Sequence, residues 1–346
     1  MANILSYRVN GWSAQGWIDT TQDALIWPIV EFQGWVAFQG HREEFEICLN
    51  GAKLQIQSFI GRRDVEEALG VGWAAVGWNA LCDVGPSARD NEQALLLEIR
   101  VRGQIIARKY FRYKDRSTES SLPLKIVLHM PKTGGTSLRT ALGEHQGALF
   151  ILPLYHDNFT IINNLSSSSM DCVDVIFGHT TYGIHNHFAR QAKYFTVLRN
   201  PYDFVSSLYF YKKYVQEDAE MLQASNILEA LSSVRRLEFD NYYTRSISGL
   251  DKDSPVTEEH LEKAISNIDS HFSFIGLAER PRETFKSFSR FFGLPLSYVR
   301  ENVSPDMVER EFIDSIQVND VIRESVRLDI KLYQHVVRKF WNMEIA

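Results

Sequence analysis

The pattern of apolar and polar residues changes near residue 120. Before that point short runs alternate apolar with polar residues, as in Phe45–Leu49 and Leu97–Val101, which is the period of strands with one buried face. Asn50-Gly51 and Arg102-Gly103 stand between consecutive runs, where hairpin turns are expected. The predicted strands are Ala24–Phe32, Gly34–Gln39, Glu44–Leu49, Lys53–Ile60, Leu95–Val101 and Gln104–Tyr113, with a short helix at Asp64–Leu69. We expect a small antiparallel β-sandwich-like accessory domain over residues 1–113.

Residues 114–121 are polar without a hydrophobic period and are interpreted as a linker. Strands and helices alternate beyond them, which predicts an α/β domain over residues 122–346, with a parallel sheet flanked by helices. The predicted strands are Lys125–His129, Val173–Phe177 and Tyr194–Leu198. The predicted helices are Ser137–Leu142, Tyr202–Tyr214, Glu258–Ile268, Arg282–Phe292 and Ser325–Trp341.

Size and composition fit two globular domains. The chain has 346 residues, of which 45% are hydrophobic and 23% charged, enough to bury a core. Its net charge of −6 gives no reason to expect nucleic acid or an anionic membrane as a partner. There is no signal-peptide pattern and no apolar run near the roughly 20 residues of a membrane span. Three widely spaced cysteines without a C-x-x-C pair argue against disulfides and zinc, so we expect a cytoplasmic protein.

The segment His129–Ser137 joins a predicted strand to a predicted helix through Gly134-Gly135. This arrangement presents backbone N–H groups and a helix N-terminus to a phosphate. Lys132 adds a cation, and hydroxyl groups come from Thr133, Thr136 and Ser137. The lysine precedes the glycines, the reverse of a Walker A loop, and no Walker B aspartate ends a strand. The segment predicts a phosphate site without the magnesium apparatus of a nucleotide hydrolase; a plain turn is the alternative.

A second segment begins at the end of the predicted strand Tyr194–Leu198. Arg199 follows the strand, Pro201 opens a helix, and Ser207 lies two turns into it. A guanidinium at a strand end suits a two-pronged contact with a phosphate. The alternative is an ion pair between Arg199 and Asp203.

Together the two segments resemble the sulfotransferase superfamily, and more closely its carbohydrate branch, which includes heparan sulfate 2-O- and 6-O-sulfotransferases. In that family a P-K-T-x-x-T-S loop binds the 5′-phosphosulfate of 3′-phosphoadenosine-5′-phosphosulfate (PAPS), and an R-[DN]-P-x(5)-S segment binds its 3′-phosphate. The first motif is matched by Lys132, Thr133, Gly134, Gly135, Thr136 and Ser137. The second is matched by Arg199 and Ser207. The resemblance implies the sulfotransferase fold, with a P-loop-like parallel sheet, and PAPS as co-substrate.

The resemblance extends over about residues 122–341. Phe177-Gly178-His179 stands where the family carries its catalytic histidine. Three further stretches match motifs of the family. Asn241–Arg245 matches the N-x-x-T-R stretch near the acceptor site. Phe274–Arg280 matches the F-x-G-L-x-E strand, and Asp329–Tyr333 matches the D-x-x-L-Y helix. It implies sulfuryl transfer to a hydroxyl, expected on a carbohydrate, with His179 as base and Lys132 on the leaving oxygen. The product of PAPS would be 3′-phosphoadenosine-5′-phosphate (PAP), and the resemblance implies no metal for the reaction.

Several alternatives stay open from the sequence. His185 and Asp203 compete with His179 as base, and His185-Asn186-His187 resembles a metal pair but lacks a third ligand. Whether His185, His187, Asn241 or Arg245 contacts the acceptor is open, as are the acceptor's identity and a homo-oligomeric state. The other functions considered are an atypical P-loop kinase and a glycan-binding protein with an inactive sulfotransferase-like domain. The first domain is dense in tryptophans that form either core or a carbohydrate-binding face: Trp12, Trp17, Trp27, Trp35, Trp73 and Trp78.

Overall fold

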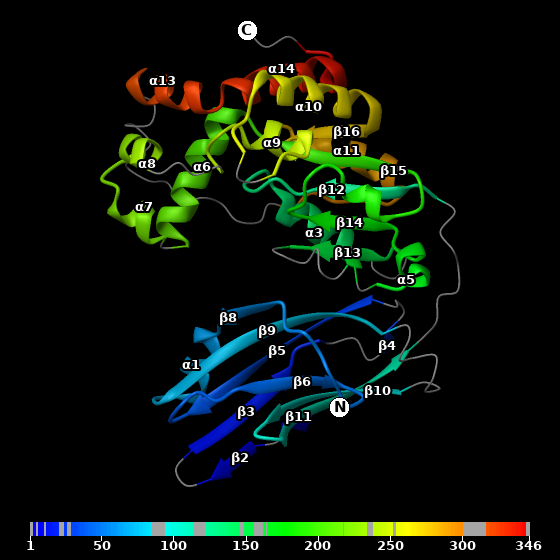
Figure 1. Cartoon of the computed structure of the whole chain (residues 1–346), viewed down its shortest axis with the longest axis vertical. Helices are drawn as coiled ribbons and strands as arrows, with labels where there is room; N and C mark the ends of the chain where they lie inside the picture. The colour runs from blue at the N-terminus through cyan, green and yellow to red at the C-terminus, as the bar shows by residue number, and fades with distance from the viewer. Residues whose placement is uncertain are drawn as a thin grey trace. The chain divides into compact units, whose positions relative to one another are not determined.

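The chain forms two compact units in a computed structural model (Figure 1). The structure describes residues 3–4, 6–9, 12–20, 24–25, 29–84, 94–113, 122–145, 149–155, 162–163, 165–216, 218–233, 238–251, 254–299 and 316–343. The N-terminal unit comprises Met1–Ser121 and His156–Val173, and the C-terminal unit comprises Leu122–Tyr155 and Asp174–Ala346. The limits 1–113, 114–121 and 122–346 stay a prediction. No helix in the described ranges is long and apolar enough to cross a membrane.

The described residues of the N-terminal unit form two sheets, antiparallel except where β4 pairs with β11. One has the order β1-β11-β10-β6-β7 and the other β2-β3-β5-β9-β8. The strands are β1 (Asn3–Ile4), β2 (Ser6–Val9), β3 (Trp12–Ile18), β4 (Ala24–Leu25), β5 (Ile29–Gln39), β6 (Phe45–Leu49), β7 (Ala52–Lys53), β8 (Ser58–Gly61), β9 (Trp73–Asp83), β10 (Ala94–Val101) and β11 (Gln104–Tyr113). The described residues of this unit also form the helices α1 (Arg63–Leu69) and α5 (Ser167–Asp171). The carboxylate of Asp83 accepts hydrogen bonds from Ser166 and Ser169, which ties the α5 segment to the end of β9.

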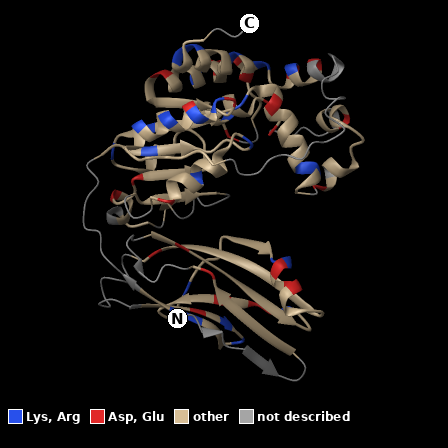
Figure 2. Ribbon diagram, turned by 180° about the vertical axis from the view of Figure 1, so that it is seen from behind, with Lys and Arg blue, Asp and Glu red and all other residues tan. Residues whose placement is uncertain are grey.

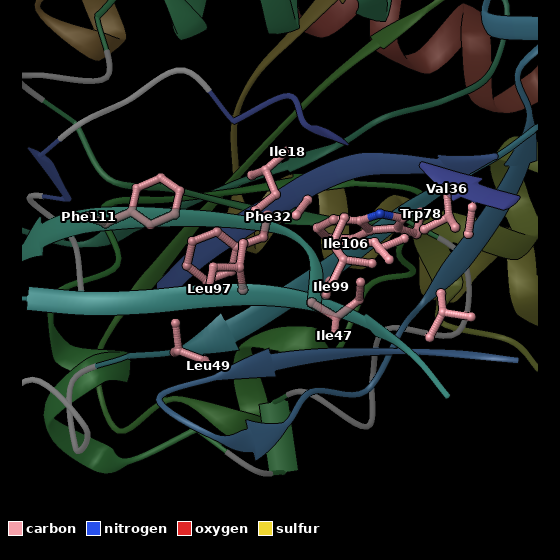
Figure 3. Close-up of a cluster of buried hydrophobic side chains, with 14 of the residues drawn as sticks. Ile18, Phe32, Val36, Ile47, Leu49, Trp78, Leu97, Ile99, Ile106 and Phe111 are labelled. Atoms are coloured by element: carbon pink, nitrogen blue, oxygen red, sulfur yellow. The ribbon is translucent and has the colours of Figure 1, made fainter. Parts of the chain in front are cut away.

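The core of this unit lies where its two sheets face each other. Phe32 and Val36 from one sheet share a buried cluster with Leu97 and Ile106 from the other (Figure 3). Two of the six tryptophans, Trp12 and Trp78, belong to this core, and Trp27 lies outside the described residues.

Glycine positions explain where the strand predictions hold and fail. The two predicted hairpins are confirmed, because Asn50-Gly51 and Arg102-Gly103 adopt positive φ between paired strands. The predicted break before Gly34 is wrong, since β5 runs through it. A Cβ at Gly34 would stand 2.6 Å from Cζ2 of Trp78, so this glycine makes room for a ring instead of forming a turn.

The C-terminal unit is built on a five-stranded parallel sheet of order β13-β14-β12-β15-β16, which confirms the predicted α/β class (Figure 1). Its strands are β12 (Leu124–Leu128), β13 (Ile151–Leu154), β14 (Val175–Gly178), β15 (Ala192–Leu198) and β16 (Phe272–Leu277). Its helices are α3 (Gly135–Gly143), η1 (Ile184–His187), α6 (Pro201–Tyr214), α7 (Ala219–Gln223), α8 (Ile227–Ser233), α9 (Tyr242–Ser248), α10 (Glu258–His271), α11 (Pro281–Phe292), α13 (Ile316–Ser325) and α14 (Arg327–Trp341).

The strands of this sheet are apolar along their length because helices cover the sheet. Val127, Phe177 and Phe195 pack in one cluster with Leu138 of α3 and Phe288 of α11. The predicted helix Ser325–Trp341 differs from the structure, in which α13 ends at Ser325 and α14 begins at Arg327.

Candidate active site

The candidate residues lie at the carboxyl edge of the parallel sheet. His179 follows β14, the Lys132 loop follows β12, and Arg199 follows β15. Leu128 at the end of β12 pairs with Gly178 at the end of β14 and with Thr196 of β15, which runs two residues further, to Leu198. The chain leaves β12 toward β13 and leaves β15 toward β16, in opposite directions across the sheet. A crevice between two such strands is the usual ligand site of open α/β sheets.

The loop after β12 contains two residues with positive φ, a backbone conformation that most residue types rarely adopt. Lys132 has a φ of 60° and Gly134 a φ of 83°, and Gly134 caps α3 without a side-chain hydrogen bond. The hydroxyl of Thr133 donates to the Met130 oxygen over 2.8 Å, which closes the turn. A Cβ at Gly135 would stand 2.0 Å from the His129 ring. Both glycines are therefore needed, one for its φ and one for the close approach of His129.

Lys132 and Arg199 meet across the crevice. A guanidinium nitrogen of Arg199, Nη1, donates to the backbone oxygen of Lys132 over 3.4 Å. The ammonium of Lys132 lies 4.1 Å from the centre of the Tyr211 ring. Burial lowers the pKa of Lys132, and the charge of Arg199 lowers it further. Within the described ranges no carboxylate pairs with either cation, and the alternative pair between Arg199 and Asp203 does not form.

Helix α6 brings a buried hydroxyl to the same strand end. Asn200 caps the helix by accepting from the N–H of Tyr202 over 3.0 Å, and Pro201 is its first residue. Ser206 donates to the Tyr202 oxygen one turn earlier, the usual bond of a helical serine. Ser207 is only 7% exposed, and its hydroxyl has no hydrogen-bond partner among the residues that the structure describes. Such a group is expected to be satisfied by a ligand or by an ordered water.

Two side chains that the sequence did not single out hold the Arg199 segment in place. The hydroxyl oxygen of Tyr243, which is fully buried, accepts from the N–H of Arg199 over 3.3 Å. The carboxylate of Glu279 accepts from the N–H of Asn200 over 2.6 Å and from the Tyr333 hydroxyl over 3.1 Å. Burial raises the pKa of Tyr243 well above its usual value, so its hydroxyl stays neutral. Only the F-x-G-L-x-E resemblance pointed to Glu279.

His179 is held in one orientation. Its Nδ1 lies 2.7 Å from the backbone oxygen of His129, and its ring stacks on the His129 ring with centres 4.5 Å apart. A carbonyl oxygen only accepts, so Nδ1 carries a proton, and in the neutral form of the ring the lone pair is on Nε2. Burial lowers the pKa of His129 to about 3, with smaller contributions from His179 and Arg139. The neighbour of His179 is therefore a neutral ring.

His185 lies apart from this group. Its Nδ1 is 2.6 Å from the hydroxyl of Tyr194, near the start of β15, and its ring stacks on His271, just before β16. These partners belong to the amino ends of their strands, the opposite edge from His179. Burial, and secondly His271, lower the pKa of His185. Among the described residues no group of three or more His, Cys, Asp or Glu could hold a metal ion.

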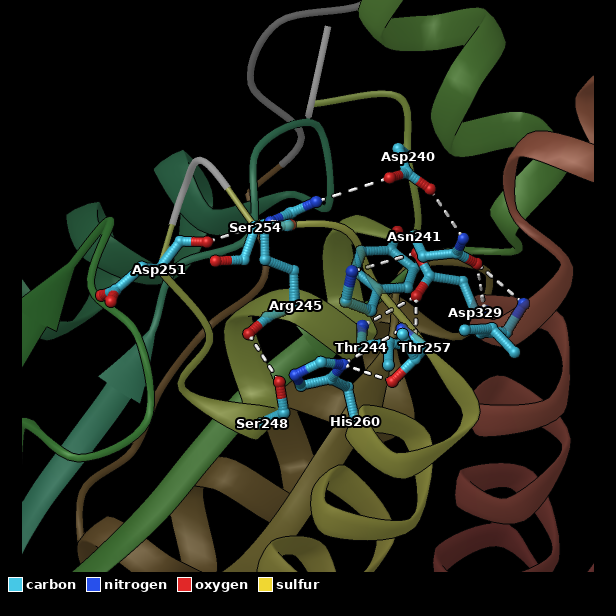
Figure 4. Close-up of polar contacts among 12 residues, drawn as sticks. Asp240, Asn241, Thr244, Arg245, Ser248, Asp251, Ser254, Thr257, His260 and Asp329 are labelled. Atoms are coloured by element: carbon cyan, nitrogen blue, oxygen red, sulfur yellow. Dashed lines mark hydrogen bonds and ion pairs between the residues drawn. The ribbon is translucent and has the colours of Figure 1, made fainter. Parts of the chain in front are cut away.

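The N-x-x-T-R stretch and the last helix cap each other (Figure 4). The carboxylate of Asp329 accepts from the N–H groups of Tyr243 and Thr244 over 3.0 and 2.7 Å, and from the Thr244 hydroxyl over 2.8 Å. The side-chain oxygen of Asn241 accepts from the N–H groups of Leu328 and Asp329. This reciprocal capping explains why the predicted single helix is broken at Val326. Burial raises the pKa of Asp329 to about 6, against the effect of its hydrogen bonds.

Arg245 is also buried and forms hydrogen bonds within the protein. It is 4% exposed, and its Nη1 donates to the backbone oxygens of Asp251 and Ser254 over 3.0 and 2.6 Å (Figure 4). Asn241 and Arg245 thus fix α9, which in turn carries Tyr243 to Arg199.

A cavity of about 1060 Å³ runs along α11. It includes Glu279 and the cations Arg282 and Lys286, but not Lys132, Arg199, Ser207 or His179. Basic and acidic residues both occur on the helices of this unit (Figure 2). The positive charge of the candidate site is therefore local, supplied by Lys132 and Arg199.

Comparisons with known proteins are sparse. No protein-family model matches the chain, and no curated protein matches it. Nine chains of solved structures match. One is the mouse sulfotransferase SULT7A1 complexed with PAP, with 14% sequence identity and a TM-score of 0.34 over 64% of this chain and 87% of that chain. A TM-score this low carries no weight for function, so the functional proposal rests on the chain's own residues.

Proposed function

We propose that the chain is a sulfotransferase, which moves a sulfuryl group from PAPS to a hydroxyl group of a carbohydrate. The observation that carries the proposal is the meeting of Lys132 and Arg199 at the crevice between β12 and β15, with His179 oriented by its Nδ1–H at the end of the neighbouring strand β14. The proposal includes the sulfotransferase fold for the C-terminal unit.

The residues fit a donor with phosphate groups at both ends. Lys132, the backbone of residues 133–136 and the start of α3 would hold the 5′ end, because these groups present a cation and N–H donors. Arg199 and Ser207 would hold the 3′-phosphate. The hydroxyl of Ser207, which has no partner in the described part of the chain, supports this, since a phosphate oxygen would satisfy it. Two neighbouring cations also favour a ligand with several negative charges.

The reaction needs one proton acceptor and one cation. His179 would take the proton of the acceptor hydroxyl on Nε2, while the hydroxyl oxygen forms a bond to sulfur. The bond between sulfur and the 5′-phosphate oxygen breaks, and its electron pair stays on that oxygen. Lys132 would stabilise the charge that develops there. PAP then leaves, and His179 returns its proton to water.

Calorimetric titration distinguishes this donor from that of a kinase. We expect PAP to bind in the micromolar range without magnesium and more tightly than ATP with magnesium. Arg199→Gln should weaken PAP binding about 30-fold, because it removes a charge-assisted contact with phosphate. Arg290→Gln, the same change at an exposed arginine in the last turn of α11, is the control and should bind normally. A clear preference for ATP with magnesium would favour the kinase.

A glycan-binding protein with an inactive sulfotransferase-like domain would differ from both enzymes in its binding and its activity. It would bind oligosaccharides but transfer no labelled sulfate from PAPS. A screen of sugar acceptors, scored by a mass gain of one sulfate, therefore identifies the acceptor and excludes the inactive domain together.

A further inference from the structure

The N-terminal unit carries two tryptophans on the sheet face opposite its core. Trp17 of β3 and Trp35 of β5 are directly opposite each other in the antiparallel register. The residues that follow them, Ile18 and Val36, belong to the buried cluster between the two sheets. Because successive side chains of a strand point to opposite faces, both tryptophans point away from that cluster, and both are partly exposed. They form a cross-strand pair of indoles on the outer face of this sheet.

Helix α1 covers one part of this outer face. Val65 of α1 clusters with Ala37 of β5, and Trp35 packs against the edge of that cluster. Further along β5, in the direction away from α1, the next outward positions are Gln33, which is exposed, and Glu31, which is partly exposed. The face beyond Trp35 is therefore accessible to a ligand.

Polar side chains lie beside the tryptophan pair. Asn79 of β9 is opposite Gln33 and donates its side-chain N–H to the carboxylate of Glu31. The side-chain oxygen of Asn79 is buried, and none of the described residues donates a hydrogen bond to it. Such an acceptor is expected to be satisfied by water or by a ligand with a hydrogen to donate. A hydroxyl group bound at this face would satisfy it.

The charges of this face favour a neutral ligand over an acidic one. The guanidinium of Arg62 donates to Asp19 over 3.0 Å and to Asp64 over 2.7 Å. The side chain of Arg62 lies over Gly77 of β9, where a Cβ would stand 3.1 Å from its Cγ. This cation is thus paired with two carboxylates, and Glu31 adds a third negative charge nearby. An anionic ligand would meet like charges here.

We propose that this outer face binds a neutral oligosaccharide, with Trp17 and Trp35 under the sugar rings and Asn79 bonded to a sugar hydroxyl. A pyranose ring has apolar C–H faces and a rim of hydroxyl groups, so it matches an aromatic platform with hydrogen-bonding side chains beside it. The inference does not depend on the proposed function, because the site lies in the N-terminal unit and contains none of the proposed catalytic residues.

The indole N–H signals of the full chain test the site in the wild type. Trp17→Phe, Trp35→Phe and Trp12→Phe assign three of the seven tryptophan signals. Cellohexaose, xylohexaose and mannohexaose, which are neutral, and hexagalacturonate, which is acidic, are titrated into the ¹⁵N-labelled protein. The signals of Trp17 and Trp35 should shift together to saturation with a neutral sugar. The signal of Trp12, which lies in the core, should stay in place.

Substitutions measure what each group contributes to the affinity for that sugar. Trp35→Leu should weaken binding about tenfold or more, because it removes half of the platform, and Trp35→Phe should lose less. Asn79→Ala should weaken binding about fivefold, the effect of one hydrogen bond. Tyr110→Leu removes an exposed ring from β11 of the other sheet, so it is the matched control and should bind normally. Urea unfolding shows that each variant is folded.

The site is overturned if no neutral sugar shifts Trp17 and Trp35, or if Trp12 shifts as much as they do. Tighter binding of hexagalacturonate than of every neutral sugar, or wild-type affinity in Trp35→Leu, would overturn it as well. These outcomes are distinct from those of the proposed function. Neutral-sugar binding by a protein that transfers no sulfate supports the site and contradicts the transferase, and sulfate transfer without such binding does the reverse.

Discussion

The imidazole of His179 donates its Nδ1–H to the backbone oxygen of His129 over 2.7 Å. His129 is the first residue of the segment that contains Lys132, so the proposed base and the proposed phosphate loop are joined by one hydrogen bond and one ring stack. With Nδ1 protonated, Nε2 is the nitrogen on which the neutral ring of His179 would accept a proton. The orientation of the base thus depends on the conformation of the loop.

Two adjacent serines of α6 test the assignment of the 3′-phosphate contact. Ser207→Ala should lower the affinity for PAP about five- to tenfold, because it removes a buried donor that no described residue satisfies. Ser206→Ala should leave the affinity unchanged, since that hydroxyl bonds to the Tyr202 oxygen. Calorimetric titration with PAP measures both. Equal effects of the two changes would remove Ser207 from the site.

Two adjacent glycines test the packing of the loop on His129. Gly135→Ala should lower the free energy of unfolding by about 3 kcal/mol, because the added Cβ would stand 2.0 Å from the His129 ring. Gly134→Ala should cost about 1 kcal/mol, the strain of a positive φ with open space around it. Urea unfolding compares them. A smaller loss for Gly135→Ala than for Gly134→Ala would contradict the close approach.

His129 makes stability depend on pH. Its pKa is about 3 in the folded protein, below the usual value of 6.5, so the unfolded chain binds more protons between these values. Stability from this group is complete above pH 6.5 and is lost as the pH falls toward 3. Between pH 7.5 and pH 5 the loss should be about 2 kcal/mol. Urea unfolding of the wild type and of His129→Gln isolates the effect, which the variant should lack. An equal loss in both proteins would assign it to other groups.

Substitution of Asp329 tests the contribution of the reciprocal capping between α9 and α14 to stability. Asp329→Ala should lower the free energy of unfolding by about 2–4 kcal/mol, because it leaves two buried N–H groups of α9 without acceptors. Asp269→Ala removes an exposed carboxylate that pairs with Lys339, and should cost at most about 1 kcal/mol. Chemical unfolding compares the two. Similar costs would mean that the buried caps contribute little.

The sequence predicted the positions of the candidate site residues better than it predicted the residues that hold them in place. Lys132, His179 and Arg199 each follow an apolar strand, and parallel strands end at a common edge, so their strand-end positions could be read from the chain. The contacts of Tyr243 and Glu279 with the Arg199 segment could not be derived from local patterns, because they join residues 44 and 79 positions apart.

Local patterns also failed where long-range packing determines the backbone. Gly34 reads as a strand break, yet it lies inside β5 opposite Trp78. Val326 continues an apolar helical stripe, yet the helix is interrupted there because Asn241 caps the next one. In both cases a distant side chain overrides the local preference.

Transfer of ³⁵S-labelled sulfate from PAPS to a library of sugar acceptors, by the wild type and by His179→Ala, tests the central claim most directly. His185→Ala, at the other edge of the sheet, is the control. We predict transfer by the wild type and the control, and a loss of at least about 100-fold in His179→Ala, the usual contribution of a general base, with PAP affinity unchanged. Undiminished transfer by His179→Ala, or no transfer by the wild type to any acceptor while it binds PAP, would contradict the account.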